Sequence, residues 1–167
     1  MIGIAAMMAA VVGLSPVTVG VSELQEATIS IALVNPQYPK PLADEARALT
    51  DHVNAERAKR GLPTLTRDAA LDRFANAKAV EMAARGYFGH TDPDGVTFQD
   101  RLRAWRWPTQ YAAENIAFDS SEPAAHNAFM TSPGHAANVL DPKEKRIGVA
   151  VVTVGSGETF YVEDFSA

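Results

Sequence analysis

The feature of this sequence that most constrains its fold lies near the C-terminus. Two apolar segments, residues 146–154 and 158–165, flank a Gly-Ser-Gly turn, and this pattern predicts a β-hairpin. In the first segment, apolar residues occupy both faces of the expected strand. One face carries Ile147, Val149 and Val151, and the other carries Ala150, Val152 and Val154. Helices must then cover both faces of the sheet. We therefore expect an α+β fold, a three-layer α/β/α sandwich with a small antiparallel sheet.

Helical spacing and end signals predict the helices of the two outer layers. Residues 42–60 repeat apolar side chains at helical intervals before Gly61. Residues 69–85 follow Asp68, a good N-cap, and stop at Gly86. Three shorter helices are expected at residues 97–105, at residues 122–130, and in the segment that carries His135 and Asn138.

The first 41 residues differ in character from the rest of the 167-residue chain. Residues 1–22 are almost wholly apolar or small, which indicates an export signal or a membrane anchor. No lysine or arginine precedes Lys40, so a buried helix of the domain is the alternative. Residues 23–41 carry three prolines near their end and are interpreted as a proline-rich tether. Residues 42–167 then form the domain.

Composition excludes some classes of function. The formal net charge is −5 and the chain has no basic run, so we expect no nucleic-acid partner. We expect contact with a membrane only through the N-terminal segment. The chain contains no cysteine, which excludes disulfides and thiolate metal sites.

Three residues are candidates for a functional site. His90 lies in a segment rich in turn residues, Glu114 stands among apolar residues, and His135 follows Gly134. Histidine and carboxylate side chains bind divalent metals and move protons near neutral pH. A lone buried carboxylate needs a partner, which could be a histidine, a metal or backbone amides. We interpret the other two histidines, His52 and His126, as surface or structural residues.

Five motifs in order resemble those of one protein family. They are residues 54–57 (NAER), 88–95 (FGHTDPDG), 114–117 (ENIA), 132–135 (SPGH) and 161–165 (YVEDF). In this order and at this spacing they are similar to the CAP superfamily, which includes cysteine-rich secretory proteins, antigen 5 and plant pathogenesis-related proteins. The cysteine-free bacterial branch is the best match. The resemblance covers roughly residues 42–165 and implies the same three-layer fold.

The resemblance also implies a cleft lined by two histidines and two glutamates. His90, Glu114 and His135 match three of these four residues. Residues 128–132 hold no carboxylate, and Ser132 stands nearest to the position of the second glutamate. Phe129 replaces the family's usual tryptophan. Three ligands with an open position are typical of catalytic zinc, so we predict that His90, Glu114 and His135 hold Zn²⁺ or another divalent cation.

The expected function is an exported binding module, secreted or associated with the cell envelope. The partner would be an apolar small molecule or lipid, or a component of the cell envelope. Residues expected to line the ligand cleft are Phe88, Asn115, Ser132, Trp105, Trp107 and Tyr111. Packing and loop-tying roles are the alternative for the tryptophans and for Asn115. A metal-dependent hydrolase acting on peptide, ester or cell-wall substrates remains open, as does a purely structural domain.

Overall fold

The computed structural model describes residues 40–154 and 159–167. The expected export signal or anchor, nearly all of the expected tether and the Gly-Ser-Gly turn lie outside the described residues. Lys40 and Pro41, the last two residues of the expected tether, form the short strand β1 (Lys40–Pro41).

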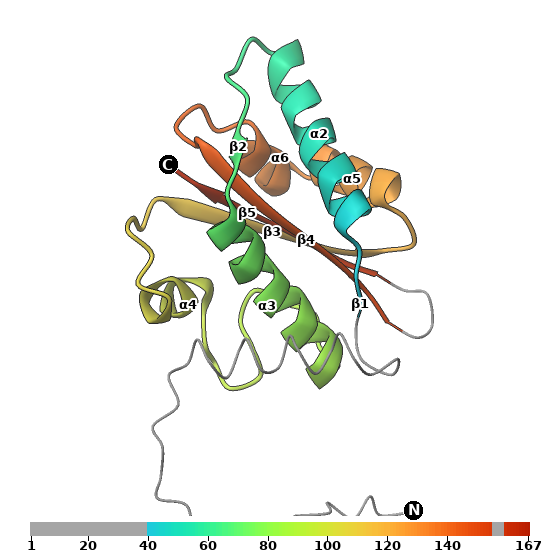
Figure 1. Cartoon of the computed structure of the whole chain (residues 1–167), viewed down its shortest axis with the longest axis vertical. Helices are drawn as coiled ribbons and strands as arrows, with labels where there is room; N and C mark the ends of the chain where they lie inside the picture. Colours follow the sequence, from blue (N-terminus) through green and yellow to red (C-terminus); the bar gives the residue numbers. More distant parts are fainter. Residues whose placement is uncertain (1–39, 155–158) are drawn as a thin grey trace, which may run out of the picture.

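The sheet is built on three long strands that pair antiparallel. They are β3 (Ala112–Asp119), β4 (Arg146–Thr153) and β5 (Thr159–Ser166), and β4 and β5 are the predicted hairpin. The strand order is β1-β4-β5-β3, which leaves β3 at one edge (Figure 1). The short strand β2 (Thr66–Arg67) pairs with β4 in parallel, the one departure from the antiparallel sheet expected. No strand was predicted at β3.

All five predicted helices are present in the described residues. Asp68 accepts hydrogen bonds from the amides of Ala70 and Leu71, and Gly86 ends the same helix with a φ of 66°. The helices are α2 (Ala43–Lys59), α3 (Ala69–Arg85), α4 (Phe98–Ala104), α5 (Glu122–Thr131) and α6 (Pro133–Val139). Within residues 40–154 and 159–167, no helix has the length and apolar character that a membrane span requires.

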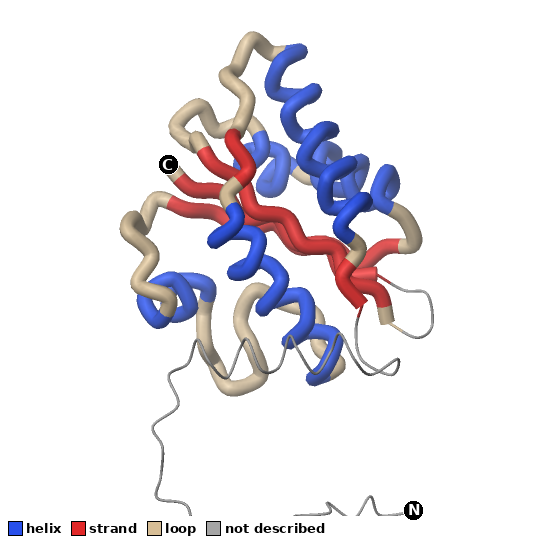
Figure 2. The backbone as a smooth tube through the Cα atoms, in the orientation of Figure 1, coloured by secondary structure: helices blue, strands red, loops and turns tan. Residues whose placement is uncertain are grey.

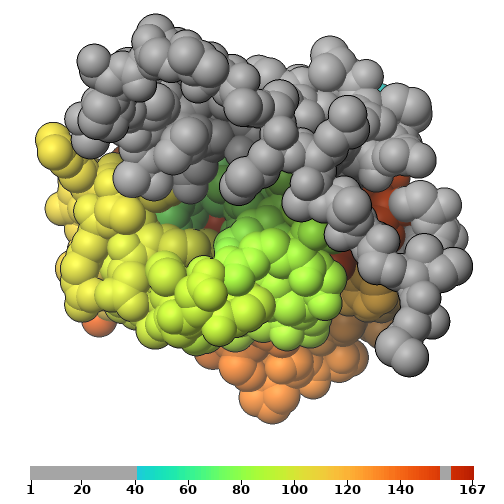
Figure 3. All heavy atoms as spheres, turned by 90° about the horizontal axis from the view of Figure 1, so that it is seen from below, coloured from blue at the N-terminus to red at the C-terminus, as the bar shows by residue number. Residues whose placement is uncertain are grey.

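The helices form two layers with the sheet between them, as expected (Figure 2). On one face, α2, α5 and α6 cover a core that includes Ile147, Val149 and Val151. On the other face, α3 covers a second core that includes Ala150 and Val152. Helix α4 packs beside α3 through Phe74, Phe98 and Leu102. The loop after α3 and the segment that includes α4 lie side by side on the face seen from below, in yellow-green and yellow (Figure 3).

Helix α3 approaches the sheet most closely at Gly148 on β4. A Cβ atom at Gly148 would lie 2.2 Å from the carbonyl carbon of Leu71, so a larger residue would force the backbones apart. Beside this contact, the amide of Val149 donates to Asp72 Oδ1 at 2.9 Å. The first turn of α3 is therefore fixed to the centre of the sheet.

Arg57 connects parts of the outer layer formed by α2, α5 and α6. Its side chain is fully buried at the end of α2 and donates to the carbonyl oxygens of Pro63, Val139, Asp141 and Glu144. These carbonyls belong to the chain just after α2 and to the chain at the end of α6. Arg57 therefore has a structural role, tying the end of α2 to the end of α6.

Candidate functional site

His90 lies on the loop between α3 and α4, and its backbone is held from both sides. Lys78 Nζ donates to the hydroxyl of Tyr87 at 2.8 Å and to the carbonyl oxygen of His90 at 3.4 Å. Arg101 Nη2 lies 3.5 Å from the same carbonyl oxygen. Because α3 supplies Lys78 and α4 supplies Arg101, the position of His90 depends on both helices.

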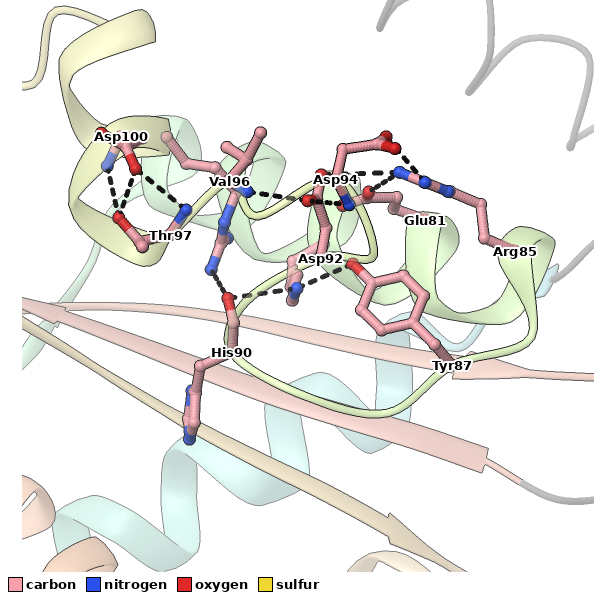
Figure 4. Close-up of polar contacts among 11 residues, drawn as sticks. Glu81, Arg85, Tyr87, His90, Asp92, Asp94, Val96, Thr97 and Asp100 are labelled. Carbon is pink, nitrogen blue, oxygen red and sulfur yellow. Dashed lines mark hydrogen bonds and ion pairs between the residues drawn. The ribbon is translucent and has the colours of Figure 1, made fainter.

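The outer part of the loop is a turn built on Asp92. Its Oδ1 accepts from the amides of Asp94 and Val96 at 2.9 and 2.8 Å, and Arg85 Nη2 donates to Asp94 at 2.8 Å. The imidazole of His90 points away from this cluster and toward the sheet (Figure 4). Both aspartates therefore point away from the imidazole, and neither is placed to act as a base beside His90 (Figure 4).

Glu114 on β3 receives His90 and Arg101 together. Its Oε1 lies 2.9 Å from His90 Nδ1, and Arg101 Nη2 contacts Oε1 at 2.8 Å and Oε2 at 2.7 Å. The side chain of Glu114 is 2% exposed, whereas that of His90 is 49% exposed. The buried carboxylate therefore has two charged or polar partners. When His90 is neutral, the contact places its proton on Nδ1 and leaves Nε2 unprotonated.

His135 approaches this pair from the opposite face of the sheet. Successive side chains of a strand point to opposite faces, so Glu114 lies on the α3 side and Asn115 on the α6 side. Asn115 Nδ2 donates to the carbonyl oxygen of His135 at 3.2 Å, and Asn138 Nδ2 donates to Asn115 Oδ1 at 2.9 Å. Asn115 therefore ties α6 to β3, in keeping with the loop-tying role that was the alternative for it.

The environment of His135 favours its neutral form. Burial and the nearby charge of His90 lower the pKa of His135. Its ring packs edge-on against Phe129, with centroids 5.3 Å apart. The two histidines are thus neighbours at the β3 edge, although their side chains come from different layers.

The arrangement does not match the three-ligand metal site that the sequence predicted. Among residues 40–154 and 159–167, no three histidine or carboxylate side chains are placed to hold a metal ion together. Glu114 explains why, because Arg101 occupies both of its oxygens and His90 shares one of them. A metal bound to Glu114 would have to displace the guanidinium of Arg101.

Ser132 takes the N-cap position of α6, directly before Pro133. Its side chain makes no capping hydrogen bond to that helix. Its position next to α6 adds no carboxylate to the site, so the second glutamate of the family has no replacement there.

Two of the aromatic residues expected to line a cleft, Trp105 and Trp107, pack against the cluster of Phe74, Phe98 and Leu102. Trp105 packs edge-on against Phe74, with centroids 5.3 Å apart. Trp107 Nε1 donates to Ser166 Oγ at 3.0 Å, and the hydroxyl of Tyr111 donates to Asp141 at 2.6 Å. These contacts match the packing alternative for both tryptophans. Phe88 is 54% exposed and lies elsewhere.

Phe88 borders an apolar hollow at the C-terminal end of α3. The hollow has a volume of about 390 Å³. The ring of Phe118 lies between those of Phe88 and Phe160, at centroid distances of 6.4 and 4.7 Å. The residues that line the hollow are Ala83, Gly86, Tyr87, Phe88, Phe118, Val154 and Phe160.

The structure also reveals site residues that sequence reasoning missed. Lys78 interrupts the apolar stripe of α3, and that interruption was the available signal of its buried role beneath the loop. Phe118 was missed because β3 was not recognised as a strand. Phe160 lies on β5 of the predicted hairpin, and no sequence signal linked it to a site. Glu163 and Asp164 are fully buried on β5, within the last of the five motifs.

Burial raises the pKa of both β5 acids. The pKa of Glu163 rises to about 8, although the amide of Asn115 donates to it and opposes the shift. Burial and the charge of Glu114, its cross-strand neighbour, raise the pKa of Asp164. Both oxygens of Asp164 and two guanidinium nitrogens of Arg101 are buried without a hydrogen-bond partner among the described residues. Asp164, Glu114 and Arg101 therefore form a largely buried polar group on the α3 side of β3 and β5.

The three-layer fold and the His90–Glu114 pair at its sheet edge define a class of small α/β/α domains. The chain belongs to the CAP family, the cysteine-rich secretory protein family, whose model matches residues 50–165. This match confirms the family that the five motifs predicted.

Relatives and solved structures support the same assignment. The uncharacterized protein YkwD of Bacillus subtilis (strain 168) is 34% identical over 119 residues, covering 71% of this chain and 46% of YkwD. An extracellular protein containing an SCP domain from Bacillus anthracis str. Ames is 30% identical with a TM-score of 0.65, covering 74% of this chain and 40% of that one. The chain thus spans less than half the length of both relatives.

A third comparison concerns the fold alone. An outer surface protein from Borrelia burgdorferi has a TM-score of 0.70 at 19% identity, covering 76% of this chain and 96% of that chain. Its structure matches the three layers over almost its whole length.

Proposed function

We propose that this CAP domain is an extracellular binding module that takes an apolar ligand, such as a lipid chain, in the hollow beside Phe88 and Phe118. The observation that carries the proposal is the pair of exposed aromatic rings at the mouth of the hollow. Phe88 and Phe118 are 54% and 42% exposed. Exposed large apolar side chains that gather around a concavity favour a binding site over solvent contact.

The size and lining of the hollow fit a small apolar ligand. Ligand pockets usually measure roughly 300–1,000 Å³ and are lined mainly by hydrophobic and aromatic side chains. The hollow here, at about 390 Å³, is within that range. Its polar groups are few, with the Tyr87 hydroxyl already bound to Lys78. We infer that shape and apolar contact, rather than charge, select the ligand.

Mutation of the hollow tests the proposal. The full-length chain is titrated with a fluorescent long-chain fatty acid, and Phe118→Ala is expected to weaken binding at least about tenfold, because the variant loses the contact between this ring and the ligand. A tenfold loss corresponds to ~1.4 kcal/mol of binding free energy. Tyr111→Ala is the matched control, since Tyr111 is an exposed aromatic residue outside the hollow. Equal affinities for wild type and Phe118→Ala would refute the proposed site.

The extracellular location rests on a relative. The protein from Bacillus anthracis, described as extracellular, is 30% identical over the matched region. The apolar first 22 residues are consistent with export or anchoring. Fractionation of cells that express the tagged full-length chain tests this, and recovery of the uncleaved chain only in the cytosol would contradict it.

A hydrolase is the second candidate, and the His90–Glu114 contact is the observation that favours it. A carboxylate that orients Nδ1 of a histidine leaves Nε2 available as a general base. Hydrolysis also needs a nucleophile or an activated water, and neither aspartate of the loop turns toward the imidazole of His90 (Figure 4). We expect no robust turnover of peptide, ester or peptidoglycan substrates, with or without added zinc. Turnover that disappears in His90→Ala would promote the hydrolase.

A further inference from the structure

The two histidines outside the candidate site lie against each other. His52 is on α2 and His126 is on α5, and their ring centroids are 5.1 Å apart with an interplanar angle of 35°. They were interpreted separately as surface or structural residues, because their wide separation in the sequence hid their proximity. The pair belongs to the face of the sheet covered by α2, α5 and α6.

A buried carboxylate orients the first ring. His52 Nδ1 lies 2.8 Å from Glu122 Oε1, and the side chains are 47% and 7% exposed respectively. Because an ionised carboxylate only accepts, the neutral ring carries its proton on Nδ1 and keeps a lone pair on Nε2. This carboxylate–histidine arrangement is the one that fixes the tautomer of histidines that bind metals.

The second ring has a nitrogen that no other group uses. His126 Nδ1 is buried and has no hydrogen-bond partner in the part of the chain that the structure describes. Burial and the nearby charge of His52 lower the pKa of His126, so the ring stays neutral near neutral pH. Neutral imidazole is the form that binds metal ions. Two charged residues of α2 that act on His126, Glu56 and Lys59, pair with each other at 2.7 Å.

The spacing of the rings suits one shared ion. Two imidazoles bound to the same zinc ion through Zn–N bonds of about 2.0–2.1 Å have centroids roughly 5 Å apart. The observed 5.1 Å is close to that spacing before any ion binds. Glu122 and His126 are four residues apart on α5 and therefore share one face of that helix.

We propose that His52 and His126 form a two-histidine site for a divalent transition metal such as Zn²⁺, with Glu122 as the residue that positions His52. Water fills the remaining positions of the ion, since no group of three ligating side chains occurs within residues 40–154 and 159–167. The site is separate from His90, Glu114 and His135. Its two histidines come from α2 and α5.

Zinc titration of the full-length chain tests the proposal. By calorimetry, His52→Ala and His126→Ala are each expected to weaken zinc binding at least about tenfold, because each removes one of two protein ligands. His90→Ala and His135→Ala serve as matched controls and should leave the affinity unchanged. Thermal unfolding of each variant confirms that the fold persists. The proposal is overturned if wild type binds no zinc, or if the loss follows His90 or His135 instead.

A spectroscopic measurement separates the roles of the three residues. With Cu²⁺ as the probe, electron paramagnetic resonance should show two nitrogen ligands in wild type and one in His126→Ala. Glu122→Gln should keep both nitrogens but weaken affinity about tenfold, the usual minimum effect of losing a partner that orients a ligand. An unchanged affinity in Glu122→Gln would contradict the positioning role, and an unchanged nitrogen count in His126→Ala would contradict the site.

Discussion

Glu114 binds two side chains at once, the imidazole of His90 and the guanidinium of Arg101. The Arg101 side chain is 12% exposed, so most of its charge is removed from water and depends on this carboxylate. The pair therefore fixes α4 and the loop after α3 against the edge strand. Loss of one partner would leave the other charge buried without compensation.

Glu114→Ala is expected to lower the free energy of unfolding by about 3 kcal/mol, because breaking a buried ion pair leaves an unpaired charge. Urea denaturation of wild type and variant measures the difference. Glu81→Ala is the control, since Glu81 pairs with Arg85 at 3.0 Å on the surface and such pairs contribute under about 1 kcal/mol. Equal losses in the two variants would show that burial does not strengthen the Glu114 contact.

Glu163 should make the stability of the domain depend on pH. Its pKa in the folded protein is about 8, raised by burial from the ordinary 4.5. The folded state keeps this proton between those two values while the unfolded state loses it, so stability is full below about pH 4.5 and falls as pH rises through about 8. In urea denaturation, Glu163→Gln should lose less stability than wild type between about pH 5 and pH 8. Parallel profiles for the two proteins would rule out this contribution.

At the scale of elements, helix α3 links the core of the domain to its candidate site. Its first turn meets the sheet at Gly148, its middle carries Lys78 beneath the His90 loop, and its end at Gly86 borders the hollow. A shift of this helix would therefore disturb all three regions. Gly148 on β4 permits this position of α3, because it has no Cβ atom to meet the helix backbone.

Gly148→Ala should lower the free energy of unfolding by about 3 kcal/mol, because the new Cβ meets backbone atoms that no rotamer change can move. The added Cβ would lie 2.2 Å from the carbonyl carbon of Leu71 and 2.5 Å from the amide nitrogen of Asp72. Gly134→Ala on α6 is the matched control, since nothing lies within 4 Å of its Cβ position. Thermal unfolding compares them, and a Gly148→Ala protein as stable as the control would contradict the close approach.

At the scale of the molecule, the sequence predicted the layers better than the site. The apolar faces of β4 and the caps at Asp68 and Gly86 are local signals, and the structure confirms the elements that they predicted. Strand β3 was missed because three of its eight residues are alanine, which is depleted in strands. That omission concealed the opposite directions of Glu114 and Asn115 and the place of Phe118 in the hollow.

The three-ligand metal site is not assembled in the structure, for a related reason. Sequence spacing placed His90, Glu114 and His135 in one region, and the structure brings them to one sheet edge. The sequence could not show that Arg101, on a separate helix, binds the carboxylate of Glu114. Nor could it show that His135 belongs to the opposite layer. Such contacts depend on how the layers pack, which no local motif specifies.

The central claim, an apolar ligand bound beside Phe88 and Phe118, is tested most directly by fluorine NMR of the full-length chain labelled with fluorinated phenylalanine. The chain has seven phenylalanines, so each ring can be assigned by single substitution. Addition of a long-chain fatty acid should shift the resonances of Phe88, Phe118 and Phe160 and leave those of Phe98 and Phe129, which lie in other clusters, unchanged. Saturating ligand that leaves Phe88 and Phe118 unshifted would contradict the account.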